Sequence, residues 1–211
     1  AAFGRLGAVD WAVELKNAAP SSRPETWDAT DRGWKEPSVG GRLGLHPAPW
    51  WRLGVSGAGG PYLRRAAGLG SRERDDHQQL LVGADASMSH RRLELWAEVL
   101  ASRFEVPIAL RRPRVPASVD ADTIAYYVEG RYQVVTGVFG ALRLGQQLFG
   151  SVAGSDGRRR SVDRDAWRVD AAVTVRPTRH AQVKLQYGWL EQAGRQRQGP
   201  QLGVVQLTLR F

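Results

Sequence analysis

Apolar and polar residues alternate in short segments from one end of the sequence to the other. In the segment 9–16, Val9, Trp11, Val13 and Leu15 are separated by polar or small residues. Successive side chains of a strand point to opposite faces, so this pattern predicts strands with one apolar and one polar face. Apolar residues at helical spacing are scarce. The alternation predicts an all-β chain of about ten strands, at residues 9–16, 39–45, 51–56, 81–88, 93–99, 124–134, 138–144, 167–176, 182–189 and 206–211.

The links between these segments are alternately short and long. The short links are HPAP, SHRR, VTG and PTRH, which favour tight turns between antiparallel strands. The long links are polar and rich in Pro, Gly and charge; they cover residues 17–38, 59–79, 102–122, 146–165 and 191–200. The pattern therefore predicts a sheet with tight turns at one end and large loops at the other, which is unusual for a compact soluble domain.

Composition excludes some classes of protein. Cysteine is absent, so disulfides and thiolate metal sites are excluded. No run of apolar residues is long enough for a transmembrane helix. The chain has 211 residues, for which we expect one domain.

The end of the sequence and its hairpins carry a resemblance. Leu207, Leu209 and Phe211 alternate with polar residues, and the stretch GGRLGLHPAPWWRLGVSGAGGPYL joins two short alternating segments by a tight turn. Both features resemble Gram-negative outer-membrane β-barrel proteins of porin-like families. The resemblance implies a transmembrane antiparallel up-and-down β-barrel in the bacterial outer membrane, with short periplasmic turns and long external loops.

The same resemblance gives roles to the termini and the aromatic residues. It implies that Phe211, Leu209 and Leu207 are the assembly signal that the barrel-assembly machinery binds. We expect residues 1–211 to form one barrel domain, either complete or as the C-terminal part of a larger barrel. Aromatic residues are expected at the two lipid interfaces. Those near the turns are Trp50, Trp51, Tyr132 and Phe211, and those near the loops are Tyr126, Trp167 and Trp189.

If the apolar face contacts lipid, the charged residues between must line the lumen, because charge on the lipid face is costly. The predicted lumen-lining and selectivity residues are Arg42, Arg52, Arg131, Arg143, Arg168, Arg176, Lys184, Asp85, Glu94, Glu98, Glu129 and Asp170. The formal net charge is +9, and arginines in a water-filled channel attract anions. In a narrow barrel the same groups would instead pair as salt bridges and fill the bore.

Two arginine clusters lie in the predicted external loops: Arg111, Arg112 and Arg114 in one, and Arg158, Arg159 and Arg160 in the other. They would contact anions or lipopolysaccharide phosphates, or form an ordinary solvated loop. No nucleic-acid-binding module is recognisable, so we expect no nucleic-acid partner. Self-association into a homo-oligomer stays open.

Enzyme motifs are absent: the sequence has no GxSxG, no HExxH and no phosphate-binding glycine loop. The histidines are scattered, and only Asp75, Asp76 and His77 form a local cluster, which reads as a polar loop end. We therefore expect no catalytic site, cofactor or metal.

Three functions fit the sequence. The first is a porin-like channel for passive diffusion of small hydrophilic solutes, anionic or neutral, with a mild anion preference. The second is a narrow, side-chain-filled barrel with a structural or interaction role through its external loops. The third is a secreted glycan-binding β-sandwich.

Overall fold

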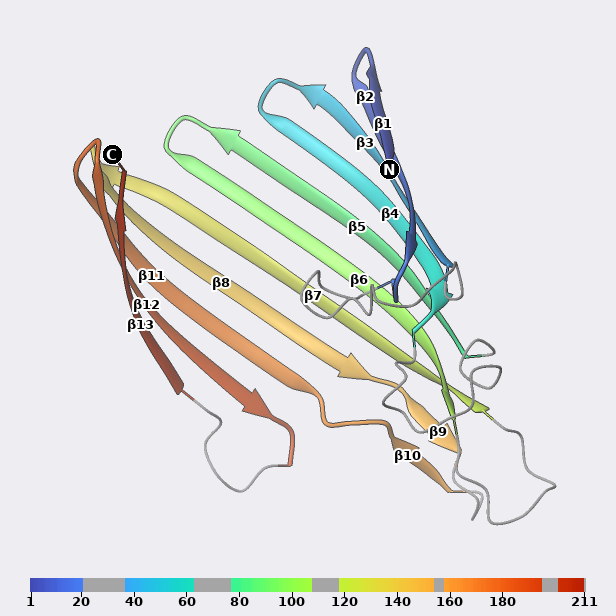
Figure 1. The fold of residues 1–211 in the computed structure, drawn as a ribbon. Coiled ribbons are helices and arrows are strands. Elements are labelled where there is room, and N and C mark those ends of the chain that lie inside the picture. The colour runs from blue at the N-terminus through green and yellow to red at the C-terminus, as the bar shows by residue number, and fades with distance from the viewer. Residues whose placement is uncertain (21–36, 63–76, 108–117, 154–157, 195–200, 211) are drawn as a thin grey trace.

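The computed structural model describes residues 1–20, 37–62, 77–107, 118–153, 158–194 and 201–210. These residues form a large curved sheet, drawn in Figure 1. Its strands, in chain order, are β1 (Ala2–Leu6), β2 (Val9–Asn17), β3 (Pro37–Ala48), β4 (Trp51–Pro61), β5 (Gln78–His90), β6 (Leu93–Pro107), β7 (Ser118–Val135), β8 (Val138–Phe149), β11 (Ala166–Thr178), β12 (Ala181–Gln192) and β13 (Gln201–Leu209). A second, two-stranded sheet pairs β9 (Ser151–Ala153) with β10 (Arg159–Ser161) in the link between β8 and β11.

Within the described ranges the main sheet has 11 strands, and each pairs antiparallel with the next strand of that sheet along the chain. The alternation of tight turns and long links is confirmed, since the tight turns lie at one end of the sheet and the strand ends that the long links join lie at the other (Figure 1). The predicted count of strands was too low by one in this sheet, because β1 was missed. That strand is short, and Gly7 at a φ of 60° makes its tight turn to β2.

In the described part of the chain, the first and last strands of the sheet do not pair with each other. Within the described chain β1 pairs only with β2, and β13 only with β12, so the sheet is an open, curved wall. Figure 1 shows these two edges on opposite sides of the molecule. The predicted all-β meander is confirmed, whereas closure into a complete barrel is not seen in these strands.

The two faces of the sheet differ in chemistry. Residues paired directly across an antiparallel sheet share a face. One row of such pairs joins Trp11 to Leu43 and Val55, and the next row joins Asp10 to Gly44 and Gly54. The predicted alternation is therefore carried through the register, and it gives the sheet an apolar face and a polar face.

Among the residues that the structure describes, neither face of the sheet packs against a hydrophobic core. Among the described residues, the only buried hydrophobic ones are Ala18 and Ala121, at the ends of strands on the side of the long links. Large apolar side chains on the apolar face are exposed, for example Leu43 (57% exposed), Val55 (56%) and Leu185 (53%). An apolar surface of this extent is unusual on a soluble monomer. No helix in the described ranges is long and apolar enough to cross a membrane.

Candidate functional site

The charged residues predicted to line a lumen all lie on the polar face. The register places eleven of them there; Arg176 follows the last regular pair of β11, and its guanidinium contacts Gln182 and Phe139 of that same face. The polar face therefore collects, from strands far apart in the sequence, residues that the alternation alone assigned to it. Their role in a channel stays a prediction.

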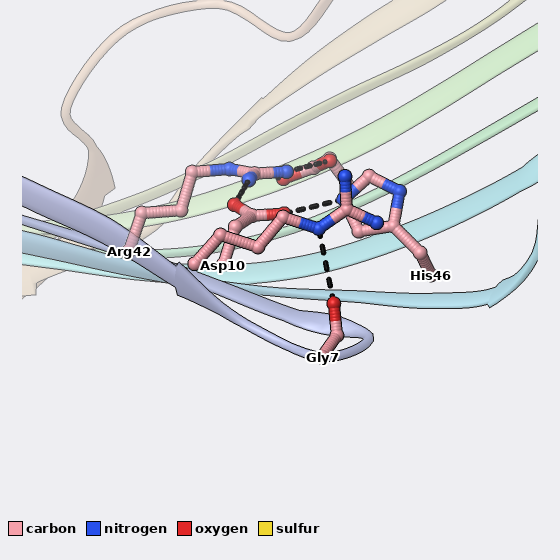
Figure 2. Close-up of polar contacts among 6 residues, drawn as sticks. Gly7, Asp10, Arg42 and His46 are labelled. Atoms are coloured by element: carbon pink, nitrogen blue, oxygen red, sulfur yellow. Dashed lines mark hydrogen bonds and ion pairs between the residues drawn. The ribbon is translucent and has the colours of Figure 1, made fainter.

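Arg42 is the centre of one ion-pair cluster. From β3 its Nη1 lies 3.3 Å from Asp10 Oδ1 on β2, and its Nη2 lies 2.6 Å from Asp85 Oδ2 on β5. The Nε of Arg42 also donates to Asp85 Oδ1 at 3.2 Å. Figure 2 shows Asp10 between Arg42 and His46, whose Nε2 contacts Asp10 Oδ2. One guanidinium thus links two carboxylates that lie three strands apart.

Glycines make room for this cluster. Gly44 and Gly54 lie directly between Asp10 and Asp85 in the row of paired residues. A Cβ on Gly54 would overlap Arg42 Nη2 and Asp85 Oδ1, and a Cβ on Gly44 would overlap the Asp10 carboxylate. The side chains of the cluster can therefore lie flat against the wall only because these two positions are bare.

The strands β6 to β11 carry ion pairs that span fewer strands on the same face. Arg131 Nη1 lies 3.4 Å from Glu94 Oε2, and Arg143 Nη1 lies 3.8 Å from Glu129 Oε2, each pair joining neighbouring strands. Arg168 donates twice to Asp170 of its own strand, at 2.8 Å in both bonds. These contacts are local, unlike the Arg42 cluster.

Aromatic rings hold three arginines of this region. The Arg143 guanidinium lies 3.7 Å from the centre of the Tyr127 ring. Arg131 and Arg176 lie over the Phe139 ring, at 4.2 and 5.0 Å from its centre. Sequence reasoning did not select Tyr127 and Phe139 as site residues, although their positions in the alternation put them on the polar face.

The predicted cations differ in their partners. Arg42, Arg131, Arg143 and Arg168 each have a carboxylate partner. Within the described ranges, Arg52, Arg176 and Lys184 have no carboxylate within ion-pair distance. These three are the cations of the set whose charge no ion pair offsets.

Two grooves run over the polar face. The larger, of about 720 Å³, lies over β6 to β12 and is lined by Tyr127, Arg143, Arg168, Asp170, Lys184 and Gln186 among others. The smaller, of about 300 Å³, lies between Arg42, Arg52, Asp85 and Trp96. Charged side chains line both grooves, and amide side chains line the larger one as well, so the grooves suit hydrated, polar solutes better than apolar ligands.

The structure describes some of the predicted loop and terminal residues and not others. Arg159 ties β10 to β9, since its guanidinium donates to Ser151 Oγ at 2.9 Å and to the Ser151 carbonyl at 2.8 Å. Arg158 and Arg160 are exposed beside it. Leu207 and Leu209 lie on the apolar face of β13, paired with Val183 and Ala181. The remaining predicted residues Phe211, Arg111, Arg112, Arg114, Asp75 and Asp76 lie outside the described residues.

Five of the predicted interface aromatics lie near opposite ends of the strands. Trp50 and Trp51 are at the turn between β3 and β4, and Tyr132 pairs with Leu93 beside the turn between β5 and β6. Trp167 and Trp189 lie toward the other ends of β11 and β12, with ring centres 4.6 Å apart. Their contact with a lipid interface stays a prediction.

No group of three or more His, Asp or Glu residues that could hold a metal ion occurs in the part of the chain that the structure describes.

The fold matches that of outer-membrane porins and channels over nearly the whole chain. A porin structure matches 99% of this chain and 60% of its own, with 9% identity and a TM-score of 0.63. The outer-membrane channel DcaP of Acinetobacter baumannii matches 98% of this chain and 60% of its own, with 11% identity and a TM-score of 0.67. The outer-membrane protein OmpT of Vibrio cholerae, in its trimer form, matches 93% and 60%, with 12% identity and a TM-score of 0.50.

Because the sequence identities are only 9% to 12%, these matches show a similarity of fold alone. The chain spans 60% of the length of each of these three proteins. No protein-family model and no curated protein sequence matches the chain.

Proposed function

We propose that this chain forms the wall of a porin-like channel in the bacterial outer membrane, through which small hydrophilic solutes diffuse passively. The observation that carries the proposal is the two-faced sheet without a core. Its apolar face exposes large side chains that lipid would cover, and its polar face collects charged residues and two grooves. The likeness to porins and to DcaP supports the same assignment. Transport of this kind needs no catalytic step.

The proposed channel has a mild preference for anions. Most of the arginines on the polar face are paired with carboxylates, so their fields largely cancel at a distance. The preference then depends on Arg52, Arg176 and Lys184, whose charges have no ion-pair partner in the described part of the chain. These three charges are partly offset by Glu98, which has no ion pair in the described chain either, and by the second carboxylate of the Arg42 cluster, so we expect weak selectivity rather than exclusion of cations.

The proposed wall needs further strands or a partner at its edges. An unpaired strand edge in the hydrocarbon region leaves backbone groups without hydrogen bonds, at a cost of several kcal/mol per group. The strands β1 and β13 each have one unpaired edge in the described chain. We propose that residues 1–211 are one domain of a larger closed barrel. OmpT was solved in a trimer form, and a homo-oligomer is compatible with the exposed apolar face here.

A second candidate is the side-chain-filled barrel with an interaction role. The ion pairs that cross the polar face favour it, since such pairs would fill a narrow bore. The third prediction, a glycan-binding sandwich, has less support, because the described strands form one large sheet rather than two facing sheets of similar size.

Planar-bilayer recording under a salt gradient tests the proposal. The full-length protein should give discrete conductance steps with a reversal potential that favours anions. Replacing Lys184→Gln and Arg52→Gln together should move the reversal potential toward zero. The matched control is Arg159→Gln, which removes a loop charge from the β9–β10 pair and should leave the reversal potential unchanged. A protein that inserts stably but never conducts would rule out the channel and leave the filled barrel.

A further inference from the structure

The tight turn between β5 and β6 lies beside two tryptophans. Trp50 and Trp51, at the turn between β3 and β4, have ring centres 5.8 Å apart, and Trp50 meets the His90 ring edge-on at 5.8 Å. The backbone joins the two turns, since the Ser89 amide donates to the Trp50 carbonyl at 2.9 Å. Arg91 and Arg92 complete the group at the tip of the β5–β6 turn. We call Trp50, Trp51, His90, Arg91 and Arg92 the turn patch.

The turn patch is exposed and positively charged. Trp50 and Trp51 are 45% and 41% exposed, and His90, Arg91 and Arg92 are exposed too. In the part of the chain that the structure describes, neither Arg91 nor Arg92 has an ion pair with a carboxylate. The nearest acidic residue along β6 is Glu94, whose carboxylate is paired with Arg131 on the polar face. The patch therefore combines flat aromatic surface with two guanidinium groups that no carboxylate of the described chain offsets.

Arg91 adopts a backbone conformation that is costly for its residue type. Its φ is 54°, the only positive φ of a residue other than glycine among the described ones. Gly7 takes a φ of 60° at the same position of the tight turn between β1 and β2. Glycine adopts this conformation without the steric cost that an arginine Cβ brings. The β5–β6 turn thus keeps an arginine at its tip where glycine would fit with less strain.

We propose that the turn patch binds the headgroup of an anionic glycerophospholipid in the membrane leaflet on the turn side. The guanidinium groups of Arg91 and Arg92 would hold the phosphate, since a guanidinium can donate two parallel hydrogen bonds to a phosphate. The indoles of Trp50 and Trp51 would lie at the level of the headgroups, and the part of the lipid's acyl chain nearest the headgroup would lie along the apolar face of the sheet. This site rests on the proposed membrane insertion but is separate from the channel.

Fluorescence quenching tests the site. The full-length protein is inserted into phosphatidylcholine vesicles that contain either brominated phosphatidylglycerol or brominated phosphatidylcholine, because bromine quenches tryptophan on contact. Anionic lipid should quench more strongly than the neutral lipid, and added salt should weaken the difference. The Trp50→Leu, Trp51→Leu double variant should lose this extra quenching, which would assign it to the patch.

Variants of Arg91 and Arg92 test whether these two residues cause the preference for anionic lipid. One arginine near an anionic surface should enrich the anionic lipid on the order of fivefold. Replacing both Arg91→Gln and Arg92→Gln should therefore abolish the preference for anionic lipid. Arg92→Gln alone leaves the strained position untouched and should lower the preference partially. The matched control is Arg179→Gln, which removes an exposed cation from the turn between β11 and β12 and should retain the preference.

Several outcomes would overturn the site. One is full preference in the Arg91 and Arg92 double variant, and another is an equal loss in Arg179→Gln, which would assign the effect to the charge of the whole turn end. Unlabelled lipopolysaccharide that displaces the brominated lipid better than unlabelled phosphatidylglycerol would give the phosphate a different source. Protection from protease measures insertion separately. An inserted protein without lipid preference contradicts only this site, whereas a protein that never inserts contradicts the proposed function as well.

Discussion

The two halves of the polar face hold their charges in different ways. Over β2 to β5, Arg42 spans several strands and lies flat on bare glycine positions, joined to Asp10 and Asp85. Over β6 to β12, the ion pairs join neighbours or lie within one strand, and aromatic rings support the arginines. The larger groove lies over this second half.

The difference indicates two separate uses of the same residue types. In the first half the charges of the Arg42 cluster tie strands together and keep the surface flat, so substitutions within that cluster should affect stability more than selectivity. In the second half the charges line a groove and contact fewer strands, so substitutions there should affect selectivity more than stability. Each prediction below tests that division.

The largest expected effect is that of Arg42→Gln. It would leave the Asp10 and Asp85 carboxylates without their shared partner, at side-chain exposures of 30% and 31%. Because the cluster is neither fully buried nor fully exposed, we expect a loss of about 1–2 kcal/mol in the free energy of unfolding. Urea unfolding of the refolded protein, followed by tryptophan fluorescence, measures it.

The control for Arg42 is Arg103→Gln. Arg103 forms an equally direct pair with Asp122, with Nε and Oδ1 2.7 Å apart, but its side chain is 58% exposed. Exposed pairs contribute little, so this variant should unfold close to wild type. Equal losses in the two variants would mean that the spanning geometry of the Arg42 cluster adds nothing.

A smaller loss is expected from Gly54→Ala. The added Cβ would displace the ends of Arg42 and Asp85 and weaken the cluster without removing any charge. We expect a loss of about 1 kcal/mol, since part of the ion-pair energy is offset by the lower entropy of alanine in the unfolded chain. The matched control is Gly140→Ala on β8, where a Cβ meets nothing within 4 Å. If the denaturant midpoints of the two variants do not differ, the Arg42 cluster does not depend on the missing side chain at Gly54.

The alternation in the sequence predicted much of the sheet but not these clusters. The period of two along each strand is a local property, so it was sufficient to place Arg143 and Asp170 on one face. The Arg42–Asp85 pair joins residues 43 positions apart, and it depends on the register across β3, β4 and β5. Register is set by turns and cross-strand packing, which no single segment contains.

The lack of non-local information also explains why β1 and the role of the glycines were not predicted. In β1 only Leu6 is a large residue on the apolar face, so the alternation is too weak to recognise within five residues. Gly44 and Gly54 looked like ordinary strand glycines because Asp10 and Asp85, the residues that need the space, lie on β2 and β5. A glycine directly opposite an aspartate recurs at Gly188 and Asp170, so this pairing is a signal that a known register would make usable.

The smallest expected effect is that of Phe139→Leu in the second half. It would remove the ring that Arg131 and Arg176 contact while keeping an apolar side chain of similar reach. A cation–π contact at a partly exposed site is worth about 0.5–1 kcal/mol, so the loss of stability should be small. Freed from the ring, Arg176 would be more mobile at the polar face, and the reversal potential in a salt gradient should shift measurably. Phe149→Leu, on the same face of β8 but with no arginine over its ring in the described chain, should change neither quantity. A large loss of stability with an unchanged reversal potential would reverse the division between the two halves.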